Sequence, residues 1–326
     1  MTNRLNGLEA IRGLAAVMVA VLHAALIAKA TGGAFILVEK AYLAVDLFFL
    51  LSGYVLTRTY EHRMPSAPTF LIARFRRLWL PVATGVMLCT GLYLALGNSV
   101  ADLLPFVLAS LAILPIYGFA INLNLPAWSI FFELVANFAH ALLFRRVPTL
   151  ALLAMVAVCA AWLALTTGDR GLNVGFAEWF WGGFPRVLMS YMLGIVLWRT
   201  WGDRPVGSER LGWLAVWAYV PLVAAVPFLL PPVGEIAFVL VTGPLILLAA
   251  LGIGDSPMAR LLGAYSFPLY ALHYPLQLIA TAIGLGWQGS LLMSLAGAAS
   301  IALLVDGRWR KALGEVIVPG AKPSVA

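Results

Sequence analysis

The sequence predicts an all-α polytopic membrane protein with about ten transmembrane helices and one additional re-entrant or interfacial apolar segment. Of its 326 residues, 62% are hydrophobic and only 11% are charged, whereas an average soluble domain has about 25% charged residues. The mean hydropathy is +0.95, and several apolar stretches reach the length of about 18 residues that a helix needs to cross a bilayer. The short alternating strands that are typical of a membrane β-barrel are absent from the sequence.

Eleven apolar segments define the expected helices. In chain order they lie near 8–28, 40–57, 78–97, 101–120, 128–144, 148–167, 180–198, 211–230, 235–252, 261–284 and 287–305. The longest non-apolar stretch is only residues 58–77, so we expect one integral-membrane domain over residues 1–326. Cys89 and Cys159 lie inside apolar runs and predict neither a disulfide framework nor a metal site.

The basic residues predict the orientation of these segments. A net charge of +7 could suggest a nucleic-acid partner in a soluble protein, but here the basic residues gather in short loops, as the positive-inside rule expects, and we predict no nucleic-acid partner. If all eleven segments crossed, the loop 58–77 and the pair Arg145–Arg146 would face opposite sides. Segment 101–120, which Pro105 and Pro115 interrupt, is the best candidate for a segment that does not cross. We therefore expect ten crossings, with every basic loop and both termini in the cytoplasm.

The first segment, "LEAIRGLAAVMVAVLHAALIA", carries two ionisable side chains. Arg12 and His23 are eleven positions apart, so on a helix they share one face, about 16 Å apart along the axis. Such a stripe usually faces a polar interior. His23 could be a general base or a hydrogen-bonded residue of the bundle, and Arg12 could anchor the topology or bind an anionic group from the cytoplasm. The internal charges disfavour a cleaved signal peptide, which Arg4 and "AKA" at 28–30 would otherwise fit.

Arginines also gather at the start of the third segment. "FLIARFRRLWLP" places Arg74 and Arg77 three positions apart, on one helix face. They could be ordinary topology anchors. They could equally form a phosphate clamp, because guanidinium groups pair with phosphate through two hydrogen bonds.

Glu133 is the most informative acidic residue. In "PAWSIFFELVANFAH" it follows Ser129 at the i+4 position and has apolar neighbours, so it needs a partner or a cavity. We expect it to orient His23 or to hold a polar substrate.

Other polar residues within the spans have no single interpretation. Asp46 lies near the Ser52–Gly53 pair, whose small side chains could serve only for close helix packing. Tyr270 and His273 are three positions apart in "YSFPLYALHYPL" and could form a site or pack with aromatic neighbours. No role follows for Arg186. Phosphate-binding glycine loops, zinc-ligand clusters and nucleophile elbows are absent from the sequence, so these residues alone do not separate an enzyme from a transporter.

Five motifs in order resemble the membrane acyltransferase-3 family, whose members acylate hydroxyl groups of surface sugars. "LNGLEAIRGLAAVMVAVLHA" is similar to the opening helix of the family, including the ten-residue separation of its Arg and His. "VDLFFLLSGYVL" resembles the second helix, and "RFRRLWLP" resembles the Arg-x-x-Arg-(Ile/Leu)-x-Pro signature. "PAWSIFFEL" is similar to Trp-Ser-Leu-x-x-Glu, with Ile130 in place of Leu, and "YSFPLYALHYPL" is similar to a late family element.

The resemblance implies the substrates and the location. The donor would be acyl-CoA, usually acetyl-CoA, bound as a substrate and not as a permanent cofactor, and the acceptor a carbohydrate or lipid-linked glycan. The protein would lie in the bilayer of a bacterial inner membrane. Some relatives carry an extracytoplasmic SGNH-type esterase domain after the last span. This sequence continues for only about twenty residues there, so we expect such an activity from another protein.

The resemblance also implies roles for the residues above. His23 would deprotonate the sugar hydroxyl or be transiently acylated, Glu133 would tune His23 or hold the acceptor, and the arginines would neutralise phosphates of coenzyme A. We assign catalysis to His23 and Glu133, and substrate binding to seven further polar residues: Arg12, Arg74, Arg77, Asp46, Ser129, Tyr270 and His273.

Two other classes of function stay open. A transporter or flippase for a glycan or glycolipid would be supported by broken helices in matched halves, and of these only the two prolines of segment 101–120 are found. A structural or assembly subunit would have no turnover. The acceptor glycan, the acyl chain, the direct or covalent route and the oligomeric state do not follow from the sequence.

Overall fold

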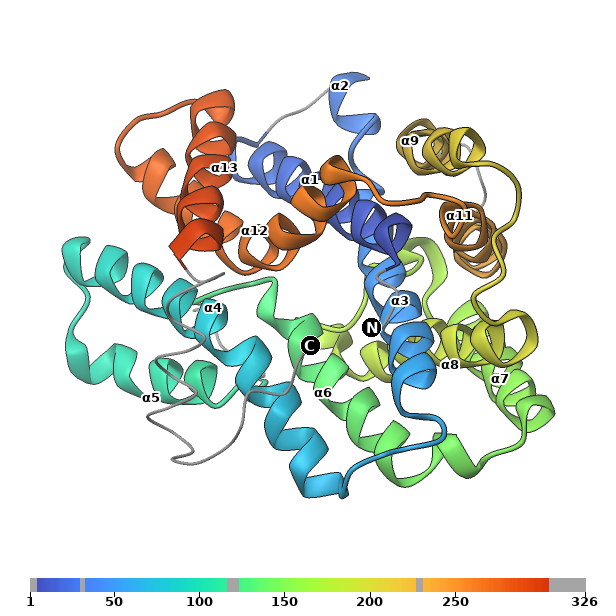
Figure 1. The fold of residues 1–326 in the computed structure, drawn as a ribbon. Coiled ribbons are helices and arrows are strands. Elements are labelled where there is room, and N and C mark those ends of the chain that lie inside the picture. The colour runs from blue at the N-terminus through green and yellow to red at the C-terminus, as the bar shows by residue number, and fades with distance from the viewer. Residues whose placement is uncertain (1–4, 30–32, 116–122, 227–230, 305–326) are drawn as a thin grey trace.

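The computed structural model describes residues 5–29, 33–115, 123–226 and 231–304, and every regular element in these ranges is a helix (Figure 1). Each of the eleven predicted segments has its described part mainly on a helix or on a run of consecutive helices, while residues 116–120, 227–230 and 305 of these segments lie outside the described ranges. The main helices are α1 (Asn6–Ile27), α2 (Gly33–Ile36), α3 (Ala44–Tyr60), α4 (Ala67–Ala95), α5 (Val100–Leu111), α6 (Ala127–Leu142), α7 (Thr149–Thr166), α8 (Gly183–Trp201), α9 (Glu209–Ala225), α10 (Val233–Ala237), α11 (Gly243–Ala250), α12 (Pro257–Ala282) and α13 (Trp287–Leu304).

Short helical turns connect several of these helices. They are η1 (Ala41–Leu43), η2 (Phe144–Arg146), η3 (Gly168–Arg170), η4 (Ala177–Gly182) and the π-helical turn η6 (Phe238–Thr242). Because η6 joins α10 to α11 without a break, the three elements form one continuous 18-residue apolar rod.

Six helical stretches of the described residues are long and apolar enough to cross a bilayer, and they make the chain an integral membrane protein. They are Asn6–Ile27, Ala41–Tyr60, Ala67–Ala95, Thr149–Thr166, Ala177–Trp201 and Val233–Ala250. The predicted total of ten crossings therefore stays a prediction.

Helix α5 is shorter than a helix that crosses a bilayer. Its 12 residues span about 18 Å, whereas the hydrocarbon core is about 30 Å thick. The indole Nε1 of Trp79, near the middle of α4, donates a hydrogen bond of 2.9 Å to the carbonyl oxygen of Leu111. Helix α5 thus lies beside the C-terminal half of α4, and the re-entrant course of this segment stays a prediction. Residues 116–120 of the predicted segment lie outside the described residues.

Ion pairs bring the basic loops together at one end of the helix bundle. Arg199 at the end of α8 binds Glu61 after α3, at 2.7 Å, and donates to main-chain oxygens of the loop between α6 and α7. Arg58 binds Asp203 at 2.6 Å. The loops after α3, α6 and α8 therefore share one end.

The start of α1 lies at this same end. Asn6 donates a hydrogen bond of 3.0 Å to the carbonyl oxygen of Gly254, in the loop before α12. That loop also lies against the loop before α9. The closeness is seen at Gly252, where an added Cβ would lie 3.1 Å from the carbonyl oxygen of Ser208. We call this end, which carries the loops after α3, α6, α8 and α11, the basic end. Its common location agrees with the predicted sidedness, while its assignment to the cytoplasm stays a prediction.

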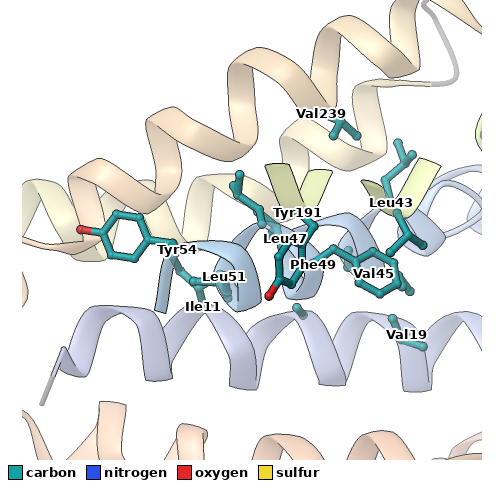
Figure 2. Close-up of a cluster of buried hydrophobic side chains, with 14 of the residues drawn as sticks. Ile11, Val19, Leu43, Val45, Leu47, Phe49, Leu51, Tyr54, Tyr191 and Val239 are labelled. Carbon is teal, nitrogen blue, oxygen red and sulfur yellow. The ribbon is translucent and has the colours of Figure 1, made fainter. Parts of the chain in front are cut away.

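Helix α1 is central and packs against α3, α11, α12 and α13. Figure 2 shows Ile11 and Val19 on the face of α1 that is turned toward α3, whose Leu47 and Leu51 lie opposite. Helix α7 is peripheral, since only 17% of its apolar window is buried, so its apolar side chains are available to face lipid.

Helices α3 and α8 cross at two glycines. A Cβ on Gly53 would lie 2.0 Å from the carbonyl oxygen of Tyr191, and a Cβ on Gly194 would lie 2.1 Å from that of Leu50. Neither distance is possible for a real side chain, so each glycine permits the approach of the opposite backbone. This close contact fixes the position of α3, which forms much of the wall of the cleft described next.

Candidate active site

A cleft between α1, α3, α4, α6 and α12 collects most of the predicted site residues. Its empty space of about 770 Å³ includes volume that is open to the surroundings. Six of the nine predicted site residues line it: Arg12, Arg74, Arg77, Ser129, Glu133 and Tyr270. Asp46, His23 and His273 are not among its lining residues.

The lining of the cleft combines charge with an apolar wall. Three guanidinium groups and one carboxylate leave a formal excess of two positive charges. The wall comes largely from one face of α3: Val45, Phe48, Phe49, Leu51, Ser52, Val55 and Leu56. Such a lining suits a ligand with an anionic part and an extended, mostly apolar part.

Glu133 is paired with Arg74 at the charged part of the cleft. Arg74 Nη2 lies 2.9 Å from Glu133 Oε1, and the hydroxyl of Ser52 donates to the same oxygen at 3.1 Å. This is the partner that the apolar surroundings of Glu133 required. Within the described residues no carboxylate forms an ion pair with Arg12 or Arg77, so their charges are available to an anionic ligand.

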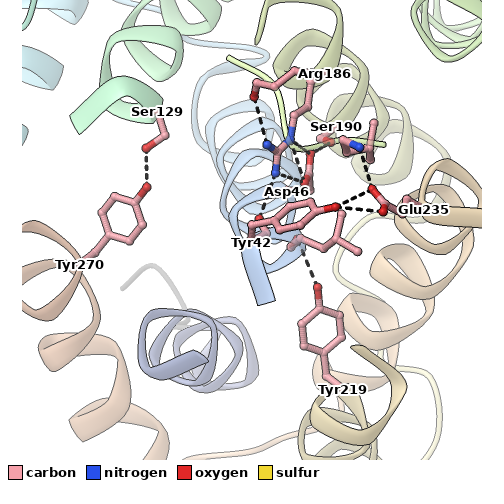
Figure 3. Close-up of polar contacts among 11 residues, drawn as sticks. Tyr42, Asp46, Ser129, Arg186, Ser190, Tyr219, Glu235 and Tyr270 are labelled. Atoms are coloured by element: carbon pink, nitrogen blue, oxygen red, sulfur yellow. Dashed lines mark hydrogen bonds and ion pairs between the residues drawn. The ribbon is translucent and has the colours of Figure 1, made fainter. Parts of the chain in front are cut away.

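A pair of hydroxyl groups joins α6 to α12 in the wall of the cleft. The oxygen atoms of Ser129 and Tyr270 are 2.5 Å apart (Figure 3), and both hydroxyls also lie within hydrogen-bonding distance of the carbonyl oxygen of Pro126, at 3.0 and 3.2 Å. The Tyr270 ring packs edge-on against Phe48. The pair therefore fixes the first turn of α6 against α12.

His23 and His273 form a contact of their own beside this wall. His273 Nε2 lies 3.2 Å from His23 Nδ1, and the two rings have centroids 5.0 Å apart. The Tyr270 ring, which lines the cleft, has its centroid 6.0 Å from that of His273. The histidine pair is thus adjacent to Tyr270, a residue that lines the cleft.

The hypothesis that Glu133 orients His23 has no contact to support it in the described part of the chain. The hydrogen bonds of Glu133 are with Arg74 and Ser52. The side chain that touches the His23 imidazole through a nitrogen is His273, which the sequence predicts as a substrate-binding residue.

Asp46, also predicted to bind substrate, is instead held in a buried ion pair outside the cleft (Figure 3). Arg186 Nη2 lies 2.8 Å from an Asp46 carboxylate oxygen, Ser190 donates to the other at 3.0 Å, and the side chains of Asp46 and Arg186 are 2% and 1% exposed. Arg186 donates further to the carbonyl oxygens of Val174 and Tyr42. These contacts occupy the Asp46 carboxylate and connect α3 to α8. Opposite charges in two separate spans could have suggested the pairing from sequence, because each charge needs a buried partner.

A second polar cluster, around Glu235, was not anticipated. The Glu235 carboxylate accepts hydrogen bonds from Lys40 at 2.8 Å, from the hydroxyl of Tyr42 at 2.9 Å and from the main-chain nitrogen of Leu172 at 2.6 Å. It ties the segment before α3 and the loop after α7 to helix α10, at the end of the bundle opposite the basic end. Each contact spans more than 60 residues of sequence, which a local pattern does not reveal.

Comparison with known proteins now decides the family. The sequence model of a family described as "Acyltransferase domain" matches residues 5–305. The chain belongs to the acyltransferase-3 family. A relative of this acyltransferase, "Protein 2 in picA locus" from Rhizobium radiobacter, is 35% identical over 160 residues, which are 41% of the chain and 79% of the relative. No solved structure matches the chain. Family membership confirms the resemblance drawn from the five motifs and identifies acyl transfer at a membrane as the general activity.

Proposed function

We propose that this acyltransferase moves an acyl group, in the first instance acetyl, from acyl-CoA to a hydroxyl group of a carbohydrate or lipid-linked glycan. The observation that carries the proposal is the cleft itself. Three arginines, a hydroxyl pair and an apolar wall converge there, and a pair of histidines adjoins it.

The arginines account for donor binding. Arg12 and Arg77 have no carboxylate partner in the described structure, so phosphate oxygens of coenzyme A would supply their counter-charge through charge-assisted hydrogen bonds. Arg74 already has a counter-charge in Glu133, so it would bind phosphate only in part or after a rearrangement. The pantetheine arm would then follow the apolar α3 wall from Leu56 toward Val45, a distance of about 16 Å along the helix.

The histidine accounts for the chemistry. His23 Nδ1 lies 2.9 Å from the carbonyl oxygen of Val19, which can only accept a hydrogen bond, so the lone pair of the neutral ring is on Nε2. This nitrogen would take the proton of the acceptor hydroxyl as its oxygen attacks the thioester carbonyl. The carbon–sulfur bond then breaks, and the thiolate of coenzyme A receives the proton from His23. The products are a carbohydrate ester and free coenzyme A.

A covalent route uses the same residues. His23 Nε2 would attack the thioester carbonyl first, and the carbon–sulfur bond would break with coenzyme A leaving as its thiolate. The acceptor oxygen would then take the acyl group from Nε2, its proton passing to the thiolate and the Nε2 lone pair being restored. Single-turnover experiments without acceptor distinguish the two routes, because only the covalent route releases coenzyme A under those conditions.

The test of the proposed function uses the purified chain in lipid nanodiscs with acetyl-CoA labelled in the acetyl group. We expect saturable binding and, when a glycan extract from the source cells is added, release of free thiol together with label in the glycan fraction. A transporter or an assembly subunit would show neither saturable binding nor loss of the acetyl group, and that result would refute the proposal.

A further inference from the structure

The hydrogen positions on the two histidines follow from their backbone contacts. His23 Nδ1 lies 2.9 Å from the carbonyl oxygen of Val19, and His273 Nδ1 lies 3.0 Å from that of Leu269. A carbonyl oxygen has no hydrogen to give, so each Nδ1 carries the hydrogen of its neutral ring. The Nε2 atom of each ring then holds a lone pair.

The contact between the two rings acquires a direction from this assignment. His273 Nε2 is 3.2 Å from His23 Nδ1. Since the lone pair is on His273 and the hydrogen is on His23, His23 donates and His273 accepts. The His23 Nδ1 hydrogen is therefore shared between the oxygen of Val19 and the nitrogen of His273. The opposite direction would need a hydrogen on His273 Nε2 and none on His23 Nδ1, which would remove the bond to Val19.

We propose that His273 is a positioning residue that holds His23 with Nε2 directed at the reacting groups and makes that atom the place where the proton is received. This inference rests on the proposed function. A proton added to His23 Nε2 leaves all three hydrogen bonds of the pair intact. A proton added to His273 Nε2 would instead set two N–H groups against each other. The pair therefore takes up one proton, and it takes it up on His23.

The surroundings of the pair suit this role. His273 is 0% exposed, and it is not part of the cleft lining, so it acts through His23 and not on the substrate. Tyr274 meets the His23 ring edge-on with centroids 5.7 Å apart, and Tyr270 flanks His273. No charged side chain forms an ion pair with either imidazole among the described residues, so His273 stays a neutral acceptor.

The first test reads the tautomers directly. The full chain, labelled with ¹⁵N-histidine and reconstituted in lipid bilayers, has only four histidines, and single substitutions assign each solid-state NMR signal. We expect protonated Nδ1 and unprotonated Nε2 in both His23 and His273. A His23 ring with its hydrogen on Nε2 would overturn the inference. This measurement needs no acceptor and no turnover, so its failure is separate from a failure of the proposed function.

The second test separates positioning from packing. The amide oxygen of His273→Gln can accept a hydrogen bond near the Nε2 position, whereas His273→Leu fills the space with no acceptor. We expect the Gln variant to retain most of kcat for transfer of labelled acetyl groups to the endogenous acceptor of inverted membrane vesicles. The Leu variant should lose about 10²-fold, the lower range for loss of acid–base function. The KM for acetyl-CoA should be unchanged in both variants. Equal losses in the two variants, or a loss confined to KM, would show a merely structural or substrate-binding role.

Discussion

Arg77→Ala tests whether the arginine cleft binds the donor, and Arg76→Ala is its matched control. The two arginines are adjacent on α4 and both are exposed, but only Arg77 lines the cleft. Each substitution removes one positive charge from the same helix turn, and alanine keeps the helix intact. A difference between the two variants therefore reports on the cleft alone.

The size of the effect follows from the contact that is lost. A hydrogen bond between a guanidinium group and a phosphate contributes about 1.5–3 kcal/mol, and each 1.4 kcal/mol corresponds to a tenfold change in affinity. Arg77→Ala should therefore weaken coenzyme A binding by about 10- to 150-fold. Because no carboxylate of the described residues pairs with Arg77, the melting temperature should stay that of the native chain. Arg77→Lys should recover only part of the affinity, because an ammonium group lacks the planar fork.

Arg74→Ala should behave differently, since Arg74 has a partner inside the protein. Its removal leaves the Glu133 carboxylate with the hydroxyl of Ser52 alone. Breaking a fully buried pair costs about 3–5 kcal/mol, and an exposed pair contributes less than about 1 kcal/mol. The side chains of Arg74 and Glu133 are 12% and 17% exposed, so we expect a loss of about 1–3 kcal/mol in the free energy of unfolding in addition to weaker binding.

The assay is equilibrium binding of coenzyme A to nanodisc-embedded variants, with thermal unfolding of the same samples. If Arg77→Ala bound coenzyme A as tightly as Arg76→Ala, the cleft arginines would be topology anchors and the proposed donor site would be wrong.

Three further predictions concern the scaffold. Asp46→Asn should lower the free energy of unfolding by about 3–5 kcal/mol, measured by denaturant titration, because it leaves the buried Arg186 charge without a counter-charge; an unchanged midpoint would contradict this role. Gly194→Val should abolish the folded peak in size-exclusion chromatography, because a Cβ there would lie 2.1 Å from a main-chain oxygen of α3. In a chain without native cysteines, Arg63→Cys and Asn98→Cys should react with an impermeant thiol reagent from opposite sides of the membrane, because α4 lies between the two positions. Labelling of both cysteines from the same side would contradict a crossing by α4.

The helices were predictable because their signal is local. Length and hydropathy mark each apolar segment, and the described part of every one of the eleven lies mainly on a helix or on a run of helices. The two prolines of segment 101–120 indicate a segment that does not cross; the helix described there, α5, has 12 residues, and the absence of a crossing stays a prediction. The number of crossings is harder to predict, because a helix of ambiguous length can lie in, on or across a bilayer with the same composition.

The candidate site could be predicted only in part. Motif spacing indicates which residues belong to it, but not which of them form pairs. Motif spacing identified the arginines, Ser129, Glu133 and Tyr270, which the fold brings into one cleft. Motif spacing does not predict which residues of distant spans pair with each other. Glu133 pairs with Arg74 and not with His23. All three are polar residues expected in the interior of the bundle, and which of them meet depends on how the helices cross.

His23→Gln tests the central claim most directly, by comparison with the native chain in inverted membrane vesicles supplied with acetyl-CoA labelled in the acetyl group. Glutamine keeps a hydrogen-bonding side chain but cannot take up a proton, so transfer of label to the endogenous acceptor should fall by about 10²–10⁴-fold. Binding of coenzyme A should stay at the native level, because His23 is not among the residues that line the donor cleft. If His23→Gln transferred label at the native rate, His23 would be a structural residue and the mechanism proposed here would be wrong.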